Sequence, residues 1–273
     1  MKKMLHTIGR IVCVLISTLC LSSCGEYQQI LKSKDPDLKY QKALDYFNDK
    51  QYVKAQTLLD EITSYYKGTD RAQDILTYLS RSHMGQKNYS AAAEYYQAYI
   101  RNYPKGRYIM EARFQVGHCY YLDVADARLD QSDTKKAIQF YIQFVEHHPE
   151  SPYAEQAYKE MNELYDRLAY KEYLSAKLYY NLGSYLGNNY LSAEIIAKNA
   201  LKTYPTNTYH EELSWIILQA KYQQTINSMD VKKQERAIDT NDEYYSFVTQ
   251  YPNSKHLAAA EKIHKEIEKI LGN

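Results

Sequence analysis

The sequence predicts an all-α protein, a solenoid of about five helix pairs closed by a C-terminal capping helix. The 273-residue chain holds 31 Tyr but only 9 Gly and 6 Pro, a composition that favours helices with aromatic packing. Apolar residues recur at the i, i+3, i+4 and i+7 positions that form one face of a helix. A short residue pattern also recurs along the chain, which indicates a repeat architecture.

The recurring pattern joins an aromatic or small residue, an Ala three positions later, an apolar stripe and a closing Pro. In the best copies 12 residues separate the Ala from the Pro, at Ala92 and Pro104, Ala137 and Pro149, and Ala193 and Pro205. The small Ala allows a second helix to approach closely, and Pro cannot continue the helix. A helix-turn-helix unit of this kind resembles the tetratricopeptide repeat. An irregular helical bundle is the alternative.

Two weaker copies extend the array at both ends. The first has Ala55 but Lys67 where Pro would fall, and the last has Ala237 and Thr240 before Pro252. Successive copies lie 37 to 56 residues apart, which is longer than a strict tetratricopeptide repeat, so insertions are expected between the pairs.

The insertions and the C-terminus have distinct patterns. The polar stretch 123–133 is predicted to be a loop. Residues 153–182 contain no Gly or Pro after Tyr153, which favours one long helix ending near Gly183, with two stacked helices as the alternative. Residues 257–271 are predicted to form a polar-faced capping helix, which the end of a repeat array requires.

The amino end has the features of an export signal. Basic residues and no acid precede the apolar run 11–21, which is shorter than the ~20 residues that span a membrane. The sequence Leu21-Ser22-Ser23-Cys24 then resembles the lipobox of bacterial lipoproteins, in which the Cys becomes the acylated N-terminus. An ordinary signal peptide with a chance cysteine is the alternative. The predicted organisation is a signal peptide at 1–23, an acylated N-terminus and linker at 24–36, and the solenoid at 37–273.

Composition and motifs argue against several classes of function. Without the three basic residues of the signal, the chain has 31 basic and 33 acidic residues, a slightly negative net charge. Nucleic acid is therefore not an expected partner. The sequence has no Gly-rich phosphate loop, paired metal ligands or nucleophile elbow, so we expect neither an enzyme nor a metal site, and no cofactor beyond the covalent lipid on Cys24. Cys119 lies among apolar residues and is expected to be buried and inert. His147 and His148 precede Pro149, where helix capping explains them.

The lipobox, the short linker, the helix pairs and the stretch Arg167-Leu168-Ala169-Tyr170-Lys171-Glu172-Tyr173 resemble the BamD family of outer-membrane lipoproteins. The most specific stretches are 25–52, 87–104 and 130–137, whereas the missing first Pro and the helix after Pro252 depart from the pattern. The resemblance implies a palmitate-bearing, periplasm-facing scaffold of the β-barrel assembly machinery. Its implied partners are a BamA-like barrel-forming subunit at the C-terminal repeats, other assembly components, and unfolded outer-membrane proteins at the N-terminal repeats.

The groove of a tetratricopeptide array is lined by the first helix of each pair. The residues expected to face this groove, open to an extended peptide that ends in an aromatic residue, are Tyr40, Leu44, Phe47, Thr77, Arg81, Met84, Phe114, His118 and Tyr121. Packing of some of them against neighbouring repeats is the alternative. Two other functions remain open: a different periplasmic tetratricopeptide adaptor lipoprotein, serving envelope growth or division, and a SusD-like glycan-binding lipoprotein.

Overall fold

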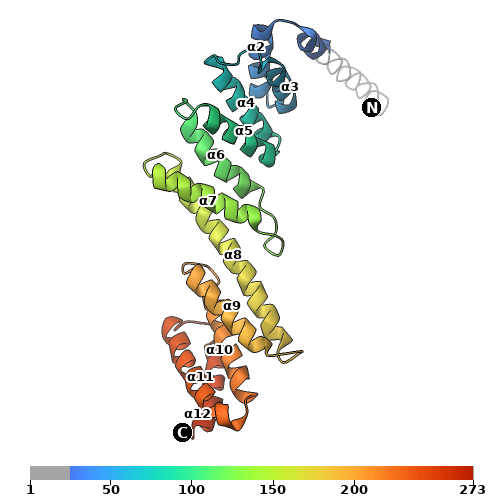
Figure 1. Cartoon of the computed structure of the whole chain (residues 1–273). Coiled ribbons are helices and arrows are strands. Elements are labelled where there is room, and N and C mark those ends of the chain that lie inside the picture. Colours follow the sequence, from blue (N-terminus) through green and yellow to red (C-terminus); the bar gives the residue numbers. More distant parts are fainter. Residues whose placement is uncertain (1–24, 273) are drawn as a thin grey trace, which may run out of the picture. The chain divides into compact units, whose positions relative to one another are not determined.

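The computed structural model describes residues 25–272, which are helical and contain no β-strand (Figure 1). The predicted signal peptide 1–23 and the predicted lipidation site Cys24 lie outside the described residues. The chain divides into two compact units, Met1–Asp123 with Gln139–Ala154, and Val124–Ile138 with Glu155–Asn273. We call these the N-terminal and C-terminal units. The expected all-α architecture of paired, stacked helices is confirmed in both.

The N-terminal unit is a stack of helices in which each one packs against the next (Figure 1). Asp35 opens the first pair because its carboxylate accepts hydrogen bonds from the backbone N–H groups of Asp37 and Leu38, at 2.9 and 3.2 Å, with Pro36 at the first helical position. The helices are α2 (Pro36–Asn48), α3 (Tyr52–Ile62), α4 (Arg71–Gly85), α5 (Tyr89–Asn102), α6 (Ile109–Leu122) and, from Gln139 on, α7 (Ser132–His147).

The C-terminal unit contains nearly all of the longest helix described, Ala154–Leu182, which confirms that the segment predicted over 153–182 is one helix and not two. Gly183 ends this helix with a φ of +57°, a conformation that side chains disfavour. The last helix coincides with the predicted capping segment. The elements are α8 (Ala154–Leu182), of which Ala154 belongs to the other unit, α9 (Asn189–Thr203), α10 (His210–Ile226), α11 (Asp230–Gln250) and α12 (Leu257–Leu271).

The predicted repeat register holds in all copies. The small residues at the equivalent position are fully buried, at Ala55, Ala92, Ala137, Ala193 and Thr240. The helices α5, α7, α9 and α11 each end two residues before the closing Pro. In the first copy, which lacks Pro, the chain leaves α3 through a turn in which Gly68 has a φ of +83°.

Close packing in the N-terminal unit also depends on a glycine within α6. A Cβ atom on Gly117 would lie 2.8 Å from the ring of Tyr141, closer than two carbon atoms can approach. Tyr141 is fully buried, so the ring has little room to move. The glycine therefore sets how near α6 and the second half of α7 lie.

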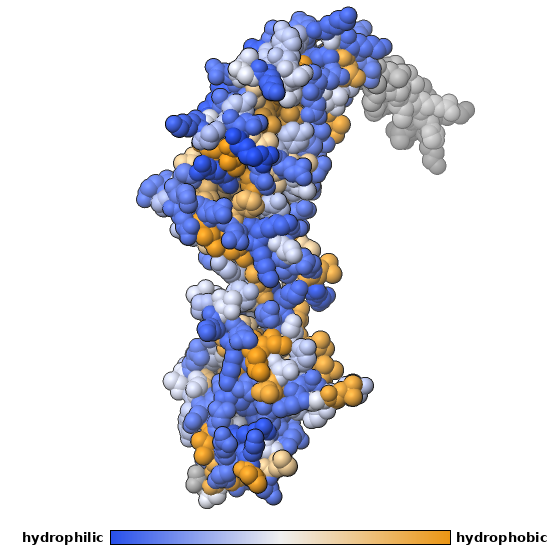
Figure 2. Space-filling model, viewed as in Figure 1, coloured by the Kyte–Doolittle hydropathy of each residue, from blue (hydrophilic) through white to orange (hydrophobic). Residues whose placement is uncertain are grey.

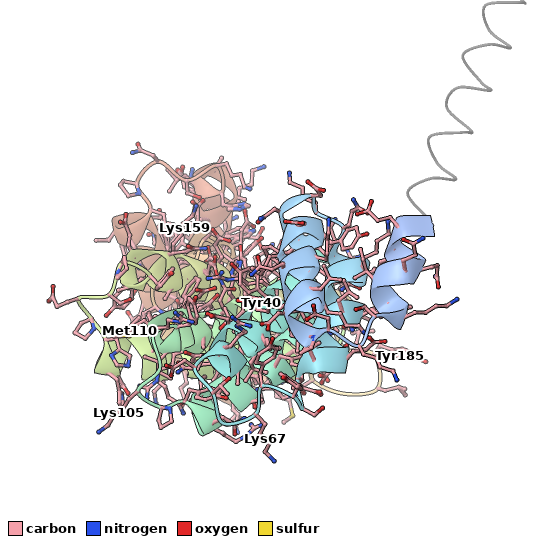
Figure 3. All side chains as sticks on the ribbon, turned by 90° about the horizontal axis from the view of Figure 1, so that it is seen from above. Tyr40, Lys67, Lys105, Met110, Lys159 and Tyr185 are labelled. Carbon is pink, nitrogen blue, oxygen red and sulfur yellow. The ribbon has the colours of Figure 1, made fainter. Side chains whose placement is uncertain are left out.

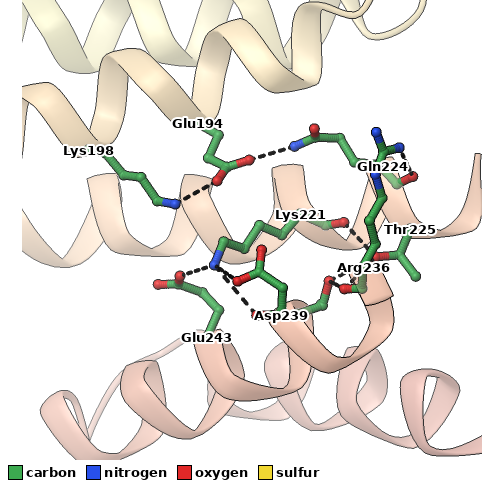
Figure 4. A network of polar contacts seen from close by, with 9 residues as sticks. Glu194, Lys198, Lys221, Gln224, Thr225, Arg236, Asp239 and Glu243 are labelled. Carbon is green, nitrogen blue, oxygen red and sulfur yellow. Dashed lines mark hydrogen bonds and ion pairs between the residues drawn. The ribbon is translucent and has the colours of Figure 1, made fainter. Parts of the chain in front are cut away.

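The C-terminal unit has a polar network that joins α9, α10 and α11 (Figure 4). The Lys221 ammonium is buried and donates to Asp239 at 2.9 Å, and it pairs with Glu243 at 2.7 Å. The Gln224 amide donates to Glu194 of α9 at 2.7 Å. These contacts give each buried polar group a partner, as low-dielectric surroundings require.

The segment expected to be a linker is partly helical. Residues 25–32 form helical turns, and Ile30 is buried in the core of the first pair beside Tyr40, Leu58 and Ile75. The expectation of a linker over 24–36 was therefore wrong for these residues. Its physical reason is the apolar pair Ile30 and Leu31, which the polar neighbours obscure in sequence.

Candidate peptide-binding groove

The residues predicted to line the groove lie on α2, α4 and α6, the first helices of three successive pairs in the N-terminal unit. On each helix they are spaced by three, four or seven residues and so share one face. Sequence reasoning thus assigned them to the correct elements. Their exposure differs from residue to residue.

Three of these residues are core residues, and the expectation that they are open to a peptide was wrong. Tyr40, Thr77 and Phe114 are only 7%, 2% and 2% exposed. Phe114 stacks on Tyr153 with ring centroids 5.0 Å apart, and Tyr40 lies among the helices in Figure 3, its ring facing the Arg71 guanidinium at 4.9 Å. A first helix packs against neighbours on both sides, so part of its inner face is covered by the next pair.

Burial also explains the chemistry of Tyr40. Desolvation, with a smaller contribution from the Asp74 carboxylate, raises the pKa of its phenol to about 12. The side chain therefore stays neutral and acts in packing. By contrast, Lys67 and Lys105 extend outward from the turns after α3 and α5 in the same view (Figure 3).

The remaining predicted residues, Leu44, Phe47, Arg81, Met84, His118 and Tyr121, are half-buried. Phe47 contacts the edges of Tyr52 and Tyr78, with centroids 5.5 and 5.0 Å away. His118 and Tyr121 stack on one another at 5.9 Å. Half-buried aromatic rings keep a fixed orientation and still present apolar surface, as binding anchors do.

Cys119 lies beneath this face and is buried, as expected. Its thiol donates to the Met84 sulfur at 3.3 Å, and burial raises its pKa to about 12. A thiol with so high a pKa remains protonated and is a poor nucleophile. Among the described residues no group of three or more His, Cys, Asp and Glu side chains is placed to hold a metal ion.

Arg81 is the one charged member of the predicted set, and it is already paired. Its Nε and Nη2 donate to the two carboxylate oxygens of Glu111, at 2.7 and 2.5 Å. The guanidinium also lies 5.7 and 5.4 Å from the ring centres of Tyr78 and Tyr108. The hydrogen bonds to Glu111 raise the pKa of Arg81 well above its ordinary value, so it is a permanent cation in a fixed position.

A second polar feature of this face was missed in the sequence. Two triads of Asp, Tyr and Arg recur in successive pairs. In the first, Asp37 accepts from the Tyr66 hydroxyl at 2.7 Å and from Arg71. The second consists of Asp74, the Tyr108 hydroxyl at 2.9 Å, and Arg107. The Asp in the first turn of each first helix, followed by Tyr and Arg close to the start of the next first helix, is the signal that could have revealed them.

The triads have a clear electrostatic consequence. Hydrogen bonds from Tyr66 and Arg71 hold the pKa of Asp37 below its ordinary value, so the carboxylate stays charged. Together with the Arg81 and Glu111 pair, the triads place alternating charges on α2, α4 and α6 and in the turn before α6, with guanidinium groups over tyrosine rings such as Tyr78 and Tyr108. Such a surface provides polar contacts for a peptide backbone next to apolar anchor points.

A family model for outer membrane lipoproteins, YfiO, matches residues 32–187. The chain belongs to this family. The YfiO family is the BamD family, so the resemblance found in the sequence is confirmed. The matched range runs from before α2 to the turn after α8 and includes every helix that carries the predicted groove residues, while α9 to α12 lie beyond it.

Comparisons with solved structures and with curated proteins give no further support to the family assignment. The TPR2AB domain of yeast Sti1 in its pHSP90 complex is 12% identical, with a TM-score of 0.38, and the match covers 85% of this chain and 98% of that one. The apo form of RapI is 12% identical, with a TM-score of 0.35 and 92% of both chains covered. At these TM-scores neither likeness carries functional information. No curated protein matches the chain.

None of the described helices is both long enough and apolar enough to cross a bilayer.

Proposed function

We propose that this YfiO-family lipoprotein is a scaffold of the β-barrel assembly machinery at the outer membrane, facing the periplasm. In this role it binds a BamA-like barrel-forming subunit and receives unfolded outer-membrane protein precursors. The observation that carries the proposal is the family match over residues 32–187, which coincides with the helix pairs that bear the groove. A scaffold of stacked helix pairs, bound to the membrane by a lipid on Cys24, needs no catalytic site for this role.

The precursor-binding step is supported by the face of the first helices. Leu44, Phe47, Met84 and Tyr121 each keep part of their apolar surface accessible there. Aromatic anchors that become fully desolvated on binding contribute about 1–2 kcal/mol each or more. Extended precursor segments that end in an aromatic residue supply the complementary side chains.

The docking of the barrel subunit is supported by exposed apolar residues on the C-terminal unit. Tyr185 and Leu186, in the turn between α8 and α9, are 69% and 90% exposed, and Met229 and Val231 near the start of α11 are 80% and 93% exposed. Figure 2 shows apolar surface projecting at the first of these turns. A cavity lined by Gly187 and Asn188 before α9 and by Asn227 after α10 places the turn between α8 and α9 beside the turn between α10 and α11. Exposed apolar side chains on neighbouring turns are typical of a protein interface.

Affinity purification tests the partner directly. The tagged full chain, cross-linked in cells and identified by mass spectrometry, is expected to recover a β-barrel subunit. A Leu186→Ser and Val231→Ser variant should lose this subunit because two exposed contacts of the interface are removed, whereas Lys105→Ser serves as the matched control at an exposed turn of the other unit. Recovery of division or envelope-growth proteins, with no barrel subunit, would instead establish the alternative adaptor function.

Precursor binding has a separate test. Replacing Phe47 and Tyr121 with Ala is expected to weaken binding of a peptide with a terminal aromatic residue by about tenfold or more. Fluorescence anisotropy measures the affinity, circular dichroism confirms the helix content, and a scrambled peptide without the terminal aromatic is the control. Equal affinity of the folded double variant and the unmodified chain would remove the groove from the proposal.

A further inference from the structure

One cavity of the N-terminal unit is lined by none of the predicted groove residues. It has a volume of about 580 Å³ and lies between α5, α6 and α7. Its residues on α6 are Arg113 and Val116. With about 100° of rotation per residue, Val116 lies on the side of the helix away from His118 and Tyr121, whereas Arg113 lies about 80° from Tyr121. The two surfaces therefore use different faces of the same helix.

The floor of this cavity is apolar. It consists of Ile100 on α5, Val116 on α6, and Phe140 and Phe144 on α7. Phe140 is held by a parallel stack on Tyr120, with centroids 5.5 Å apart and planes 5° from parallel, and Phe144 packs against the buried Phe114. Ile100 and Phe140 keep part of their apolar surface accessible, and the buried Val116 and Phe144 pack beneath them, so the floor offers a preformed apolar surface to a side chain.

The rim of the cavity is basic. Arg101 stands at the end of α5, Arg113 on α6, and His147 and His148 at the end of α7. No acidic side chain occurs among the residues that line it. Basic residues in the last turns of α5 and α7 also stabilise the helix dipoles, but Arg113 lies within the first half of α6, where that explanation does not apply.

Arg113 is held in place by a neutral imidazole. Its Nη1 donates to Nε2 of His148 at 2.7 Å, so this nitrogen of His148 acts as an acceptor. Burial, with the nearby charges of Arg113 and His147, lowers the pKa of His148 and keeps the ring neutral. The positive charge of the guanidinium is therefore oriented by the imidazole and is not neutralised by it.

We propose that this cavity binds an acidic linear segment of a partner protein, with one bulky apolar side chain on the floor and flanking carboxylates at Arg101 and Arg113. Cations from separate helices border an apolar floor, and this arrangement is complementary to an apolar residue between acidic neighbours. A volume of 580 Å³ lies within the range of about 300–1,000 Å³ that is usual for binding sites. The site is distinct from the groove and does not depend on the function proposed for the groove.

The test uses the full chain in phosphatidylcholine nanodiscs and a fluorescent peptide, blocked at both ends, with the central sequence Asp-Phe-Glu. Blocked ends remove any terminal carboxylate, so that only the side chains carry negative charge. Anisotropy is expected to show saturable binding of this peptide. Peptides with Asn-Phe-Gln or Asp-Ala-Glu at the centre should lose affinity by about tenfold or more.

Variants of the chain locate the binding. Arg101→Gln with Arg113→Gln should weaken the Asp-Phe-Glu peptide about tenfold or more, since charge-assisted contacts are lost. Gln143→Trp fills the cavity from an exposed rim position without altering the floor and should weaken it by a similar factor. Arg128→Gln, at an exposed basic residue outside the cavity, and Phe47→Ala, in the groove, should bind the peptide as the unmodified chain does.

Three results would overturn the proposal. The first is that the acidic peptide shows no saturable binding. The second is that both cavity variants bind the peptide with unchanged affinity while their unfolding midpoints match the unmodified chain. The third is that the chain binds anionic lipid vesicles but not the peptide, and that the cavity variants abolish the binding of vesicles. The last result would assign the site to a membrane surface. Phe47→Ala separates these results from a failure of the groove, because it affects only the latter.

Discussion

His83 shows how a single side chain couples the N-terminal unit to pH. It is buried near the end of α4, and neither ring nitrogen has a hydrogen-bond partner in the described part of the chain. The imidazole stacks on Tyr95 with centroids 4.9 Å apart and planes at 21°. Burial lowers the pKa of His83, and the more distant Asp60 carboxylate only partly opposes this effect.

The direction of the pH effect follows from this shift. The unfolded chain binds a proton near pH 6.5, whereas the folded chain resists it, so the stabilisation is complete above that pH and is lost as the pH falls below it. Acidification from about pH 7.5 to about 5.5 should lower the free energy of unfolding, with a contribution from His83 of at most about 1.4 kcal/mol per pH unit below 6.5.

The measurement compares the unmodified chain with His83→Phe, which keeps the stack on Tyr95 but cannot take up a proton. Urea unfolding at both pH values is expected to show a smaller loss in the variant. His148→Phe and His210→Phe are controls for two other histidines whose pKa burial also lowers. An identical pH dependence in the unmodified chain and His83→Phe would contradict this assignment.

At the scale of the helices, the buried Lys221 of α10 joins this helix to α11 through Asp239 and Glu243. Burial alone opposes its charge, but hydrogen bonds to Glu243 and Asp239 outweigh that penalty, and its pKa lies above the ordinary value. Beside it, the hydroxyls of Thr225 and Thr240 hydrogen-bond across the same two helices at 2.8 Å. The two helices are thus joined by polar groups at a place where other pairs use Ala.

Replacing Lys221 with Met should reduce the free energy of unfolding by about 2 kcal/mol, because the carboxylates lose a charged donor. Lys198→Met, which breaks the exposed pair with Glu194 within α9, should cost less than about 0.5 kcal/mol. Chemical denaturation of both variants gives the comparison. Similar losses in the two would mean that the buried pair is not stronger than a surface pair.

The helix pairs were predictable because their signals are local. The small residue that allows a close crossing and the Pro that ends the second helix act within one repeat, as in Ala92 and Pro104. The single helix over 154–182 was predictable for the same reason, since nothing interrupts it before Gly183. The exposure of the first-helix residues could not be predicted, because it depends on contacts with residues distant in sequence. Phe114 is covered by Tyr141, Phe144 and Tyr153, whereas Tyr121 stays partly open.

The basic cavity escaped prediction for a related reason. Its residues come from three helices, and His147 and His148 have a sufficient local explanation as capping residues before Pro149. Only the fold brings them next to Arg113, 35 residues away, as the hydrogen bond to His148 shows. A periodic pattern identifies which face of a helix is apolar, but not which basic side chains of other helices lie at its border.

For the whole molecule, the predicted attachment to the membrane rests on Cys24, which lies outside the described residues. Cys24→Ala is expected to leave the chain exported but without lipid, because the lipobox cysteine is the attachment point. Labelling cells with a radioactive fatty acid measures the attachment of lipid, and cell fractionation measures export. Cys119→Ser is the matched control and should remain labelled. Continued labelling of Cys24→Ala would exclude the predicted lipoprotein anchor at this site.

The division into two units falls within a helix and not in a connecting loop. Residues 132–138 of α7 belong to the C-terminal unit, and residues 139–147 of the same helix belong to the N-terminal unit. A single recombination point at residue 123 or 155 would therefore leave one unit without a segment of its own. A chimera that exchanges the C-terminal unit between relatives has to replace both 124–138 and everything from 155 onward, which takes three junctions in the chain and not one.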